Sequence, residues 1–296
     1  MESQQDDRGI AVSISMVLST SFLILTVTGN LLVLLVLGRA GQLRATVRLL
    51  LVNLAVLDLT LGCFVLPYVV NPSNDSLSPQ GSPDSAVFCQ AVGFMRVLSL
   101  SGSSFTLFAL SYERYVAIAY PLKHMHMITV ETVVKYMVVI WLLAVTVAVL
   151  PFLGLGQYLY SPHQFVCWPE GHTFTLVFVF LVFFTTFVNM VFMYFCIFRA
   201  VRRRRSIIHA LVLRIAQGFT GQKVERFRTT TTITLVLGVY GITWAPFCCT
   251  HVLSILFRAF TPVAATEMLT TCFLLFITPS DITAAGLLKL IKAEYF

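Results

Sequence analysis

Long apolar runs alternate with short polar segments along the whole chain. Each run contains at least 20 residues, and about 20 apolar residues let a helix cross the hydrocarbon layer of a membrane. A membrane β-barrel would instead show segments of about ten alternating residues, and an open sheet would leave backbone groups unpaired in lipid. The pattern therefore predicts an all-α integral membrane protein with a bundle of seven transmembrane helices. The seven runs, almost free of Asp, Glu, Lys and Arg, are residues 10–37, 49–70, 86–110, 136–157, 173–198, 229–257 and 261–280.

Composition excludes an ordinary soluble protein. Of the 296 residues, 57% are hydrophobic and 11% are charged, and the mean hydropathy is +0.86. Soluble domains carry about 25% charged residues.

The runs divide the chain into three parts. We expect an extracellular N-terminus at residues 1–9, a transmembrane domain at residues 10–286, and a short cytoplasmic amphipathic helix at residues 287–296. The last segment mixes Leu and Ile with Lys289 and Lys292, which is typical of a helix lying on the membrane surface.

The basic residues are distributed unevenly between the two sides of the predicted bundle. All 20 Lys and Arg residues except Arg8, Arg96 and Arg258 fall on the side opposite the N-terminus. Because cytoplasmic loops are rich in Lys and Arg, we expect an extracellular N-terminus and a cytoplasmic C-terminus. The sequon at Asn74 then lies outside the cell, where it can be glycosylated. The net charge of +7 sits in short loops between spans, so membrane lipids rather than nucleic acid are the expected contacts.

Two of the seven cysteines stand apart from the others. Cys89, at the start of the third span, and Cys167, in the loop after the fourth, both lie on the outer side. That compartment is oxidising, so we predict a disulfide between them. The other five are interpreted as small apolar residues within spans: Cys63, Cys196, Cys248, Cys249 and Cys272.

Ionisable residues within spans are costly and therefore candidates for function. Asp58, in the second span, is interpreted either as a cation or proton site or as a carboxyl group hydrogen-bonded to nearby Ser, Asn or Thr. Arg96, in the third span, either meets an anionic ligand, pairs with Glu267 of the seventh span, or extends outward to water. All of these alternatives stay open from the residues alone.

A charged pair stands where the third span reaches the cytoplasm. Glu113 and Arg114 are followed by Tyr115. Adjacent residues on a helix do not face each other, but a flexible arginine can fold back onto the neighbouring carboxylate. The pair is interpreted either as a switch or as an ordinary charge pair at the membrane interface.

Short motifs occur in a fixed order: Gly29-Asn30, Leu54-Ala55-Val56-Leu57-Asp58, Glu113-Arg114-Tyr115, Pro121, Trp141, Trp244-Ala245-Pro246 and Pro279. Together with the seven spans, and with 25 residues from Cys89 to Arg114, this order resembles the rhodopsin-like (class A) G-protein-coupled receptors. Any one motif is weak evidence, but their joint order is specific. The resemblance covers nearly the whole chain. It implies a plasma-membrane receptor that transmits an extracellular ligand signal to heterotrimeric G proteins.

The resemblance also implies roles for individual positions. Asp58, Ser103 and Asn30 correspond to a sodium-binding core, and sodium is the only cofactor expected. Trp244 corresponds to the residue beneath the ligand pocket that responds to the ligand. Arg114 would contact the G-protein α-subunit.

The chain departs from the family pattern at several positions. The motif Asn-Pro-x-x-Tyr near the end of the seventh span is replaced by Thr278-Pro279-Ser280-Asp281-Ile282, and Thr186 stands where most members have a proline. Arg226 occupies the position of the acid that usually restrains the arginine of the third span, and Glu225, one residue away, is the alternative acid. Losing that restraint favours signalling without ligand, whereas losing the tyrosine opposes it, so an altered basal activity is expected.

The ligand pocket implied by the resemblance is mostly apolar and aromatic, with one cation, one acid and one imidazole. Arg96 stands where amine receptors carry an aspartate, which argues against a biogenic amine and favours an anionic ligand. The candidate pocket residues are Arg96, Val97, Leu100, Phe178, Trp244, Phe247, His251, Glu267 and Met268.

Other classes of protein fit the sequence less well. An intramembrane metal hydrolase needs three or four converging ligands, and of the six histidines only His251 falls within a span, so we predict no enzyme activity. A transporter is suggested by the charged residues within spans, but paired broken helices are missing. The changed motif of the seventh span also leaves open a receptor-like protein that does not couple and acts as a scaffold or heterodimer partner.

Overall fold

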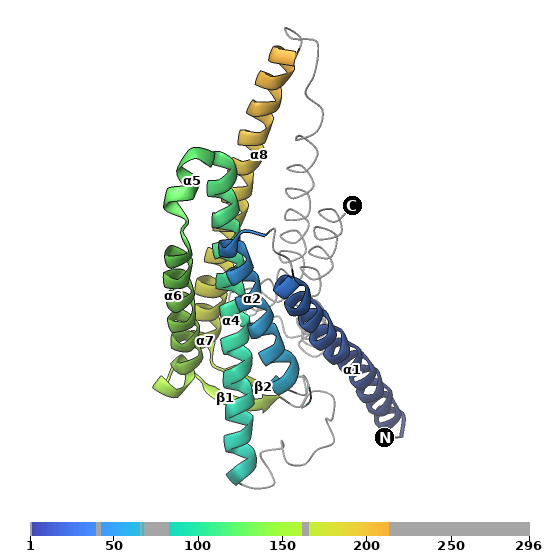
Figure 1. Cartoon of the computed structure of the whole chain (residues 1–296). Helices are drawn as coiled ribbons and strands as arrows, with labels where there is room; N and C mark the ends of the chain where they lie inside the picture. The colour runs from blue at the N-terminus through green and yellow to red at the C-terminus, as the bar shows by residue number, and fades with distance from the viewer. Residues whose placement is uncertain (1, 40–42, 66, 68–82, 162–165, 213–296) are drawn as a thin grey trace, which may run out of the picture.

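The computed structural model describes residues 2–39, 43–65, 67, 83–161 and 166–212 (Figure 1). Within these ranges, five helical stretches are long and apolar enough to cross a membrane: Thr20–Arg39, Ala45–Val65, Ala86–Ala119, Val130–Leu153 and His172–Ala200. They confirm the first five predicted spans as helices. The predicted sixth and seventh spans and the helix at residues 287–296 lie outside the described residues.

The first two helices run side by side. Helix α1 (Glu2–Arg39) starts within the predicted N-terminal segment, and α2 (Ala45–Thr60) continues into a π-helical turn, η1 (Leu61–Val65). A buried apolar cluster joins α1 to α2 through Val33, Leu37 and Val47. Burial of these side chains, rather than capping, stabilises the start of α2, because its N-cap residue Arg44 makes no side-chain capping bond.

Helix α4 (Pro83–Ala119) is the central element of the described bundle. It packs against α2, α6 and α8, and 72% of its most apolar stretch is buried, against 28% for α6. Proline at the first helical position is tolerated because its missing N–H would be unpaired there. Buried hydroxyl groups along α4 donate to carbonyl oxygens one turn earlier, as Ser104 does to Leu100 at 2.8 Å and Ser111 to Leu107 at 2.8 Å. A polar central helix is thereby compatible with burial.

A break at Tyr120 separates α4 from the short α5 (Pro121–Met127). Helix α6 (Val130–Val149) follows, and its N-cap Thr129 accepts a hydrogen bond from the backbone N–H of Thr132 at 3.2 Å. The helix tightens into the 3₁₀ turn η2 (Leu150–Leu153) and stops at Gly154, whose φ of 94° is left-handed.

The charge-poor run at residues 136–157 therefore coincides with the fourth helical stretch only in part. The helix starts earlier, at Val130, because Thr129 caps it, and the helical stretch ends at Leu153. The residues after Gly154 continue the apolar pattern but leave the helix, since the left-handed backbone at Gly154 redirects the chain.

A β-hairpin follows, so the expectation of an all-α chain is corrected to a mostly helical one. Strand β1 (Gln157–Ser161) pairs antiparallel with β2 (Val166–Glu170), and Tyr160 lies opposite Cys167. The hairpin covers the end of the bundle opposite α5 (Figure 1). We call these the hairpin end and the α5 end.

The last described helical stretch is continuous but not uniform. Helix α7 (His172–Phe178) passes through a π-helical segment, η3 (Val179–Phe184), into α8 (Thr185–Val212). The Thr185 hydroxyl donates to the Phe180 carbonyl oxygen, five residues earlier, at 2.8 Å. A π segment thus forms although Thr186 replaces the family proline. Helix α8 extends beyond the apolar run at residues 173–198 as far as Val212.

Candidate functional site

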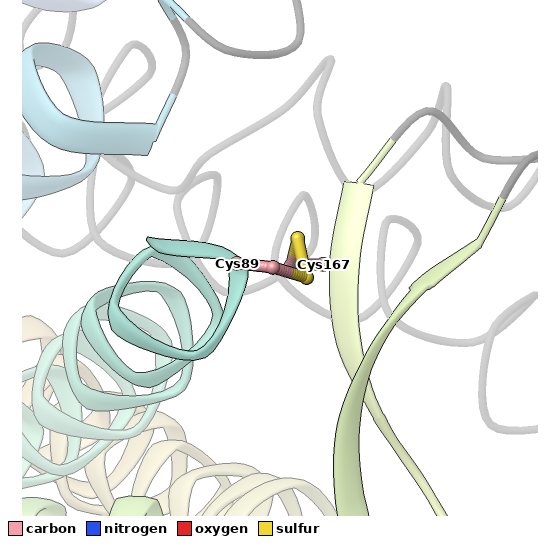
Figure 2. Close-up of a disulfide and its surroundings, with 2 residues drawn as sticks. All are labelled: Cys89 and Cys167. Atoms are coloured by element: carbon pink, nitrogen blue, oxygen red, sulfur yellow. A yellow bond between two sulfur atoms is a disulfide. The ribbon is translucent and has the colours of Figure 1, made fainter. Parts of the chain in front are cut away.

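The predicted disulfide joins the hairpin to the central helix. Cys89 near the start of α4 and Cys167 on β2 are bonded, with a Cα–Cα distance of 5.5 Å (Figure 2). Both residues are buried. The bond therefore fixes β2 against α4 at the hairpin end, and the sequence prediction is confirmed.

Tyr158 of β1 provides a second attachment of the hairpin. Its hydroxyl donates to the Ala148 carbonyl oxygen of α6 at 2.8 Å, and its ring packs against Phe152 with 5.2 Å between centroids. An added Cβ at Gly93 of α4 would collide with the Tyr158 ring. Burial raises the pKa of Tyr158 above its ordinary value. The hairpin is thus held by α4 and α6 together, which sequence analysis did not predict.

Arg96 lies beneath the hairpin, inside the bundle. Its side chain is almost fully enclosed, with 3% of the residue exposed, so it does not extend outward to water. The guanidinium carbon lies 5.2 Å from the ring centroid of Trp168 on β2, a cation–π contact. Within the described residues its Nη1 atom has no hydrogen-bond partner. The predicted alternative partner, Glu267, lies outside those residues.

Trp168 connects Arg96 to the aromatic core. Its ring contacts Phe178 edge-on at 5.4 Å between centroids, and Phe178 belongs to the same buried cluster as Val97 and Leu100. The structure thus places four of the nine predicted pocket residues in one region. Trp168 is not among the predicted pocket residues, although its position directly after Cys167 is a usable sequence signal. The other five lie outside the described residues: Trp244, Phe247, His251, Glu267 and Met268.

Two of the three predicted sodium ligands lie together in the middle of the bundle. The Ser103 hydroxyl of α4 donates to Asp58 Oδ1 of α2 at 3.0 Å, and both residues are buried. This contact brings a carboxylate and a hydroxyl together, as the sodium interpretation requires, and it equally fits the hydrogen-bonded alternative. Asn30 is buried in α1, where its amide donates to the Thr26 carbonyl oxygen at 2.9 Å.

A polar chain beside this pair joins three helices. Trp141 Nε1 of α6 donates to Asn53 Oδ1 of α2 at 2.9 Å, and Asn53 Nδ2 donates to Thr106 Oγ1 of α4 at 2.8 Å. The side chains of Trp141, Asn53 and Thr106 therefore satisfy one another, as buried polar groups in low-dielectric surroundings require. The family motif residue Trp141 thus fixes how α6 sits against α2 and α4.

At the α5 end, Glu113 and Arg114 form the expected ion pair. Arg114 Nε lies 3.5 Å from Glu113 Oε2, although the residues are adjacent on α4. Glu113 is buried, while Arg114 is partly exposed. Tyr115 packs edge-on against Tyr120 with 6.0 Å between ring centroids. Arg226, predicted to lie close to this site, is outside the described residues.

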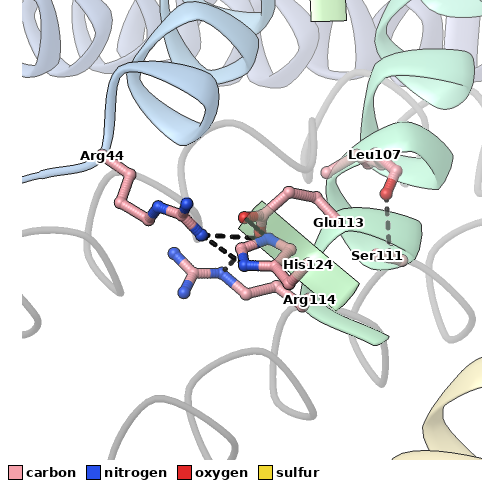
Figure 3. A network of polar contacts seen from close by, with 6 residues as sticks. All are labelled: Arg44, Leu107, Ser111, Glu113, Arg114 and His124. Atoms are coloured by element: carbon pink, nitrogen blue, oxygen red, sulfur yellow. Dashed lines mark hydrogen bonds and ion pairs between the residues drawn. The ribbon is translucent and has the colours of Figure 1, made fainter. Parts of the chain in front are cut away.

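Two further residues join this charged site, and sequence analysis did not assign them to it. His124 Nε2 of α5 lies 3.0 Å from Glu113 Oε1, and His124 Nδ1 contacts Arg44 Nη1 (Figure 3). Arg44 precedes α2, so the network draws on three separate elements. The break after Tyr120 returns α5 toward α4, a placement that no local sequence signal gives.

The glycosylation sequon at Asn74 lies outside the described residues. Within the described part of the chain, no group of three or more His, Cys, Asp or Glu residues could hold a metal ion.

These features define a multi-pass membrane receptor: apolar helices around a central α4, a disulfide-anchored hairpin, and a charged pair at the opposite end. Residues 29–280 match the family model of the 7 transmembrane receptor (rhodopsin family), and the chain belongs to this family. It is therefore a class A G-protein-coupled receptor by family and a multi-pass protein of the plasma membrane.

The chain is also similar to individual curated receptors. It is 28% identical to the melatonin receptor type 1A of Mus musculus over 229 residues, which cover 76% of this chain and 61% of that receptor. It is 28% identical to the histamine H2 receptor of Canis lupus familiaris over 247 residues, covering 80% of this chain and 65% of that receptor. The matched region thus spans less than two thirds of these relatives. The relatives are receptors and not enzymes.

Proposed function

We propose that this receptor transmits an extracellular ligand signal to a heterotrimeric G protein, with its hairpin end outside the cell and its α5 end in the cytoplasm. The positive-inside distribution supports this orientation. It places the Cys89–Cys167 disulfide in the oxidising compartment and the basic residues of α8 inside. The N-terminus is then extracellular, the C-terminus cytoplasmic, and Asn74 available for glycosylation.

The observation that carries the proposal is that one continuous helix, α4, bears both predicted contact points. Arg96 lies beneath the hairpin, and the Glu113–Arg114 pair lies at the other end of α4. An event at one end can bias the other only through a connected element with alternative arrangements. Helix α4 packs against α2, α6 and α8, and the ion pair at its end supplies a contact that can open.

We further propose an anionic ligand group for the pocket near Arg96. Arg96 is a buried cation whose Nη1 has no hydrogen-bond partner among the described residues, and a carboxylate or a similar anion would stabilise it. Trp168 and Phe178 provide aromatic surface for an apolar ligand body. The histamine H2 receptor is named for a cationic amine, and Arg96 would repel such a ligand, so that specificity is not carried over to this chain.

Sodium binding at Asp58 remains part of the proposal. The Asp58 carboxylate and the neighbouring Ser103 hydroxyl together offer a sodium ion two oxygen ligands, the kind that hard cations prefer. Thermal unfolding of purified receptor in NaCl and in choline chloride tests this, with Asp58→Asn as the control. A stabilisation by NaCl that persists in Asp58→Asn would rule out this site.

Basal activity is expected to differ from that of typical members, because Arg226 and Ile282 replace an acid and a tyrosine of the family pattern. Restoring the acid with Arg226→Glu should lower basal signalling. Restoring the tyrosine with Ile282→Tyr should raise it. Basal cAMP and calcium output in cells measures both, and no change in either variant would exclude an altered balance.

The decisive experiment measures nucleotide exchange on purified Gα subunits of each class by full-length receptor. We expect exchange that exceeds the rate without receptor and that Arg114→Ala abolishes. No exchange on any Gα class would instead favour a non-coupling scaffold or heterodimer partner.

The anionic contact is tested separately, once a ligand is found. Equal ligand potency at wild type and Arg96→Ala would exclude it.

A further inference from the structure

The π-helical segment η3 lies between two α-helices whose buried residues do not follow one α-helical repeat. Buried positions recur every four residues from α7 through η3 into α8. Residues of an α-helix are about 100° apart around its axis, so four steps of four residues drift by about 160°. A π turn takes up one extra residue and so removes about 100° of this drift. The five buried positions are Phe174, Phe178, Val182, Thr186 and Met190.

The π segment therefore keeps Phe178 of α7 on the face that α8 packs against α4. Phe178 belongs to the same buried cluster as Met190 of α8. Its ring contacts Trp168 with 5.4 Å between centroids, and Trp168 in turn stacks on Arg96. Without the extra residue, α7 would be turned by about 100° relative to α8. Phe178 would then leave Trp168, and the aromatic wall beside Arg96 would be lost.

The backbone at residue 186 does not by itself require a π segment. A proline there would exclude a regular α-helix, because it lacks the N–H that bonds four residues back and its ring collides with that carbonyl group. Thr186 carries the N–H, so an uninterrupted α-helix is sterically allowed. Another group must favour the π segment in this chain.

Thr185 supplies that group. Its backbone N–H donates to the Phe180 carbonyl oxygen, five residues earlier, which is the bond that defines a π-helix. Its hydroxyl donates to the same oxygen at 2.8 Å. On the regular helix α6, the Thr146 hydroxyl instead donates to the Leu142 carbonyl oxygen, four residues earlier, at 2.8 Å. Both donors of Thr185 thus converge on an oxygen that the π geometry brings within reach.

We propose that Thr185 is a positioning residue whose hydroxyl holds the π segment in place of the family proline. It thereby keeps Phe178 against Trp168 in the aromatic wall beside Arg96. Loss of one ordinary hydrogen bond changes an equilibrium about fivefold, so loss of the hydroxyl should shift the segment toward the α-helical form. The consequence for ligand binding rests on the proposed function, whereas the effect on Phe178 does not.

The test follows the surroundings of Phe178 by fluorine NMR. Full-length receptor in detergent carries para-fluorophenylalanine in place of Phe178 alone, and Trp168→Leu gives the resonance of this label without its indole neighbour. Thr185→Val removes the hydroxyl at nearly constant shape and should move the resonance toward the Trp168→Leu position. Thr185→Ser keeps the hydroxyl and should leave the resonance unchanged. Thr146→Val, which removes an exposed hydroxyl bond from α6, is the matched control and should also leave it unchanged.

A proline provides the rescue. The double variant Thr185→Val, Thr186→Pro should return the resonance to the wild-type position, because proline excludes the α-helical alternative. A wild-type resonance in Thr185→Val would overturn the proposal, and so would a displaced resonance in the double variant. If Thr185→Val does not fold, as judged by thermal unfolding, recovered folding of the double variant supports the proposal and continued misfolding overturns it.

The measurement needs neither a ligand nor a G protein. Absence of nucleotide exchange on every Gα class, or equal ligand potency at wild type and Arg96→Ala, would remove the proposed function and leave this result standing. An unmoved resonance in Thr185→Val would remove the role of Thr185 alone.

Discussion

The hairpin end of α4 and its α5 end are held by different kinds of contact. At the hairpin end, a disulfide and the buried ring of Tyr158 fasten β1 and β2 to α4 and α6. At the α5 end, α4 also packs on a buried apolar cluster that includes Val116, Ile128 and Val133, and it adds the charged contacts of Glu113, His124 and Arg44. Covalent and packed contacts keep one geometry, whereas hydrogen-bonded charges can exchange partners at small cost.

The difference indicates a division of tasks along one helix. The hairpin end supplies a fixed frame around Arg96, whose cation–π contact with Trp168 depends on the position of β2. The α5 end supplies a pair that can open. Mutations at the hairpin end should therefore lower stability, and mutations at the α5 end should change activity at nearly constant stability.

Removing the disulfide should have the largest effect on stability. Cys89 and Cys167 are 78 residues apart in sequence, and closing a loop of that size is worth about 4 kcal/mol in the chain-entropy account. Cys89→Ser should lower the apparent Tm of the purified receptor by about 10 °C. The exposed, unbonded Cys63 gives the control, Cys63→Ser. An equal Tm in both variants would show that the disulfide does not fix the frame.

The contact between Gly93 and Tyr158 should rank second. Gly93→Ala introduces a Cβ that collides with the ring, and such overpacking costs about 2 kcal/mol. Gly38→Ala on α1 is the matched control, since no atom lies within 4 Å of an added Cβ there. Thermal unfolding compares the two. A Gly93→Ala protein as stable as Gly38→Ala would contradict the close packing of the hairpin on α4.

Tyr158→Phe should have a smaller, pH-dependent effect. Losing the bond to the Ala148 carbonyl oxygen should cost about 1 kcal/mol at neutral pH. Because burial raises the pKa of Tyr158 above its unfolded value of about 10, folding favours the neutral phenol. That contribution is complete below pH 10 or so and is lost as the pH rises beyond it. Unfolding measured from pH 8 to pH 11 should therefore show a steeper fall for wild type than for Tyr158→Phe, and parallel curves would contradict this.

Glu113→Gln should have the smallest effect on stability and should still change activity. The substitution keeps the side-chain shape, and its partner Arg114 is partly exposed, so we expect a cost below about 1 kcal/mol. Weaker attraction for Arg114 should raise basal nucleotide exchange about threefold. Exposed Glu131, which pairs with Lys135 at 2.8 Å, gives the control Glu131→Gln. A large loss of Tm without a change in exchange would reverse the comparison between the two ends.

Local chemistry explains which parts of the site could be predicted. The pairing of Cys89 with Cys167 is predictable because both lie on the oxidising side, and that of Glu113 with Arg114 because they are adjacent. His124 was visible only as a histidine after the third span. Its role depends on α5 turning back onto α4, which follows from the break at Tyr120 and from packing.

The boundary of the fourth span shows the same limit in the fold. Apolar residues continue past Leu153 up to the strand that starts at Gln157, so hydropathy alone extends the helix. Gly154 ends it through a left-handed backbone conformation that composition does not report. Hydropathy measures the preference of side chains for lipid, whereas the end of a helix depends on a single backbone angle.

The sequence by itself determined the membrane class, the first five helical spans, the disulfide and the family, because each follows from side-chain hydrophobicity or from residues at fixed spacing. The tertiary structure alone decided that Arg96 stacks on Trp168, that Tyr158 fastens the hairpin, and that His124 joins Glu113 to Arg44. Those contacts link residues from different elements. Their geometry depends on how helices pack and where loops return, and this information is distributed over the whole bundle.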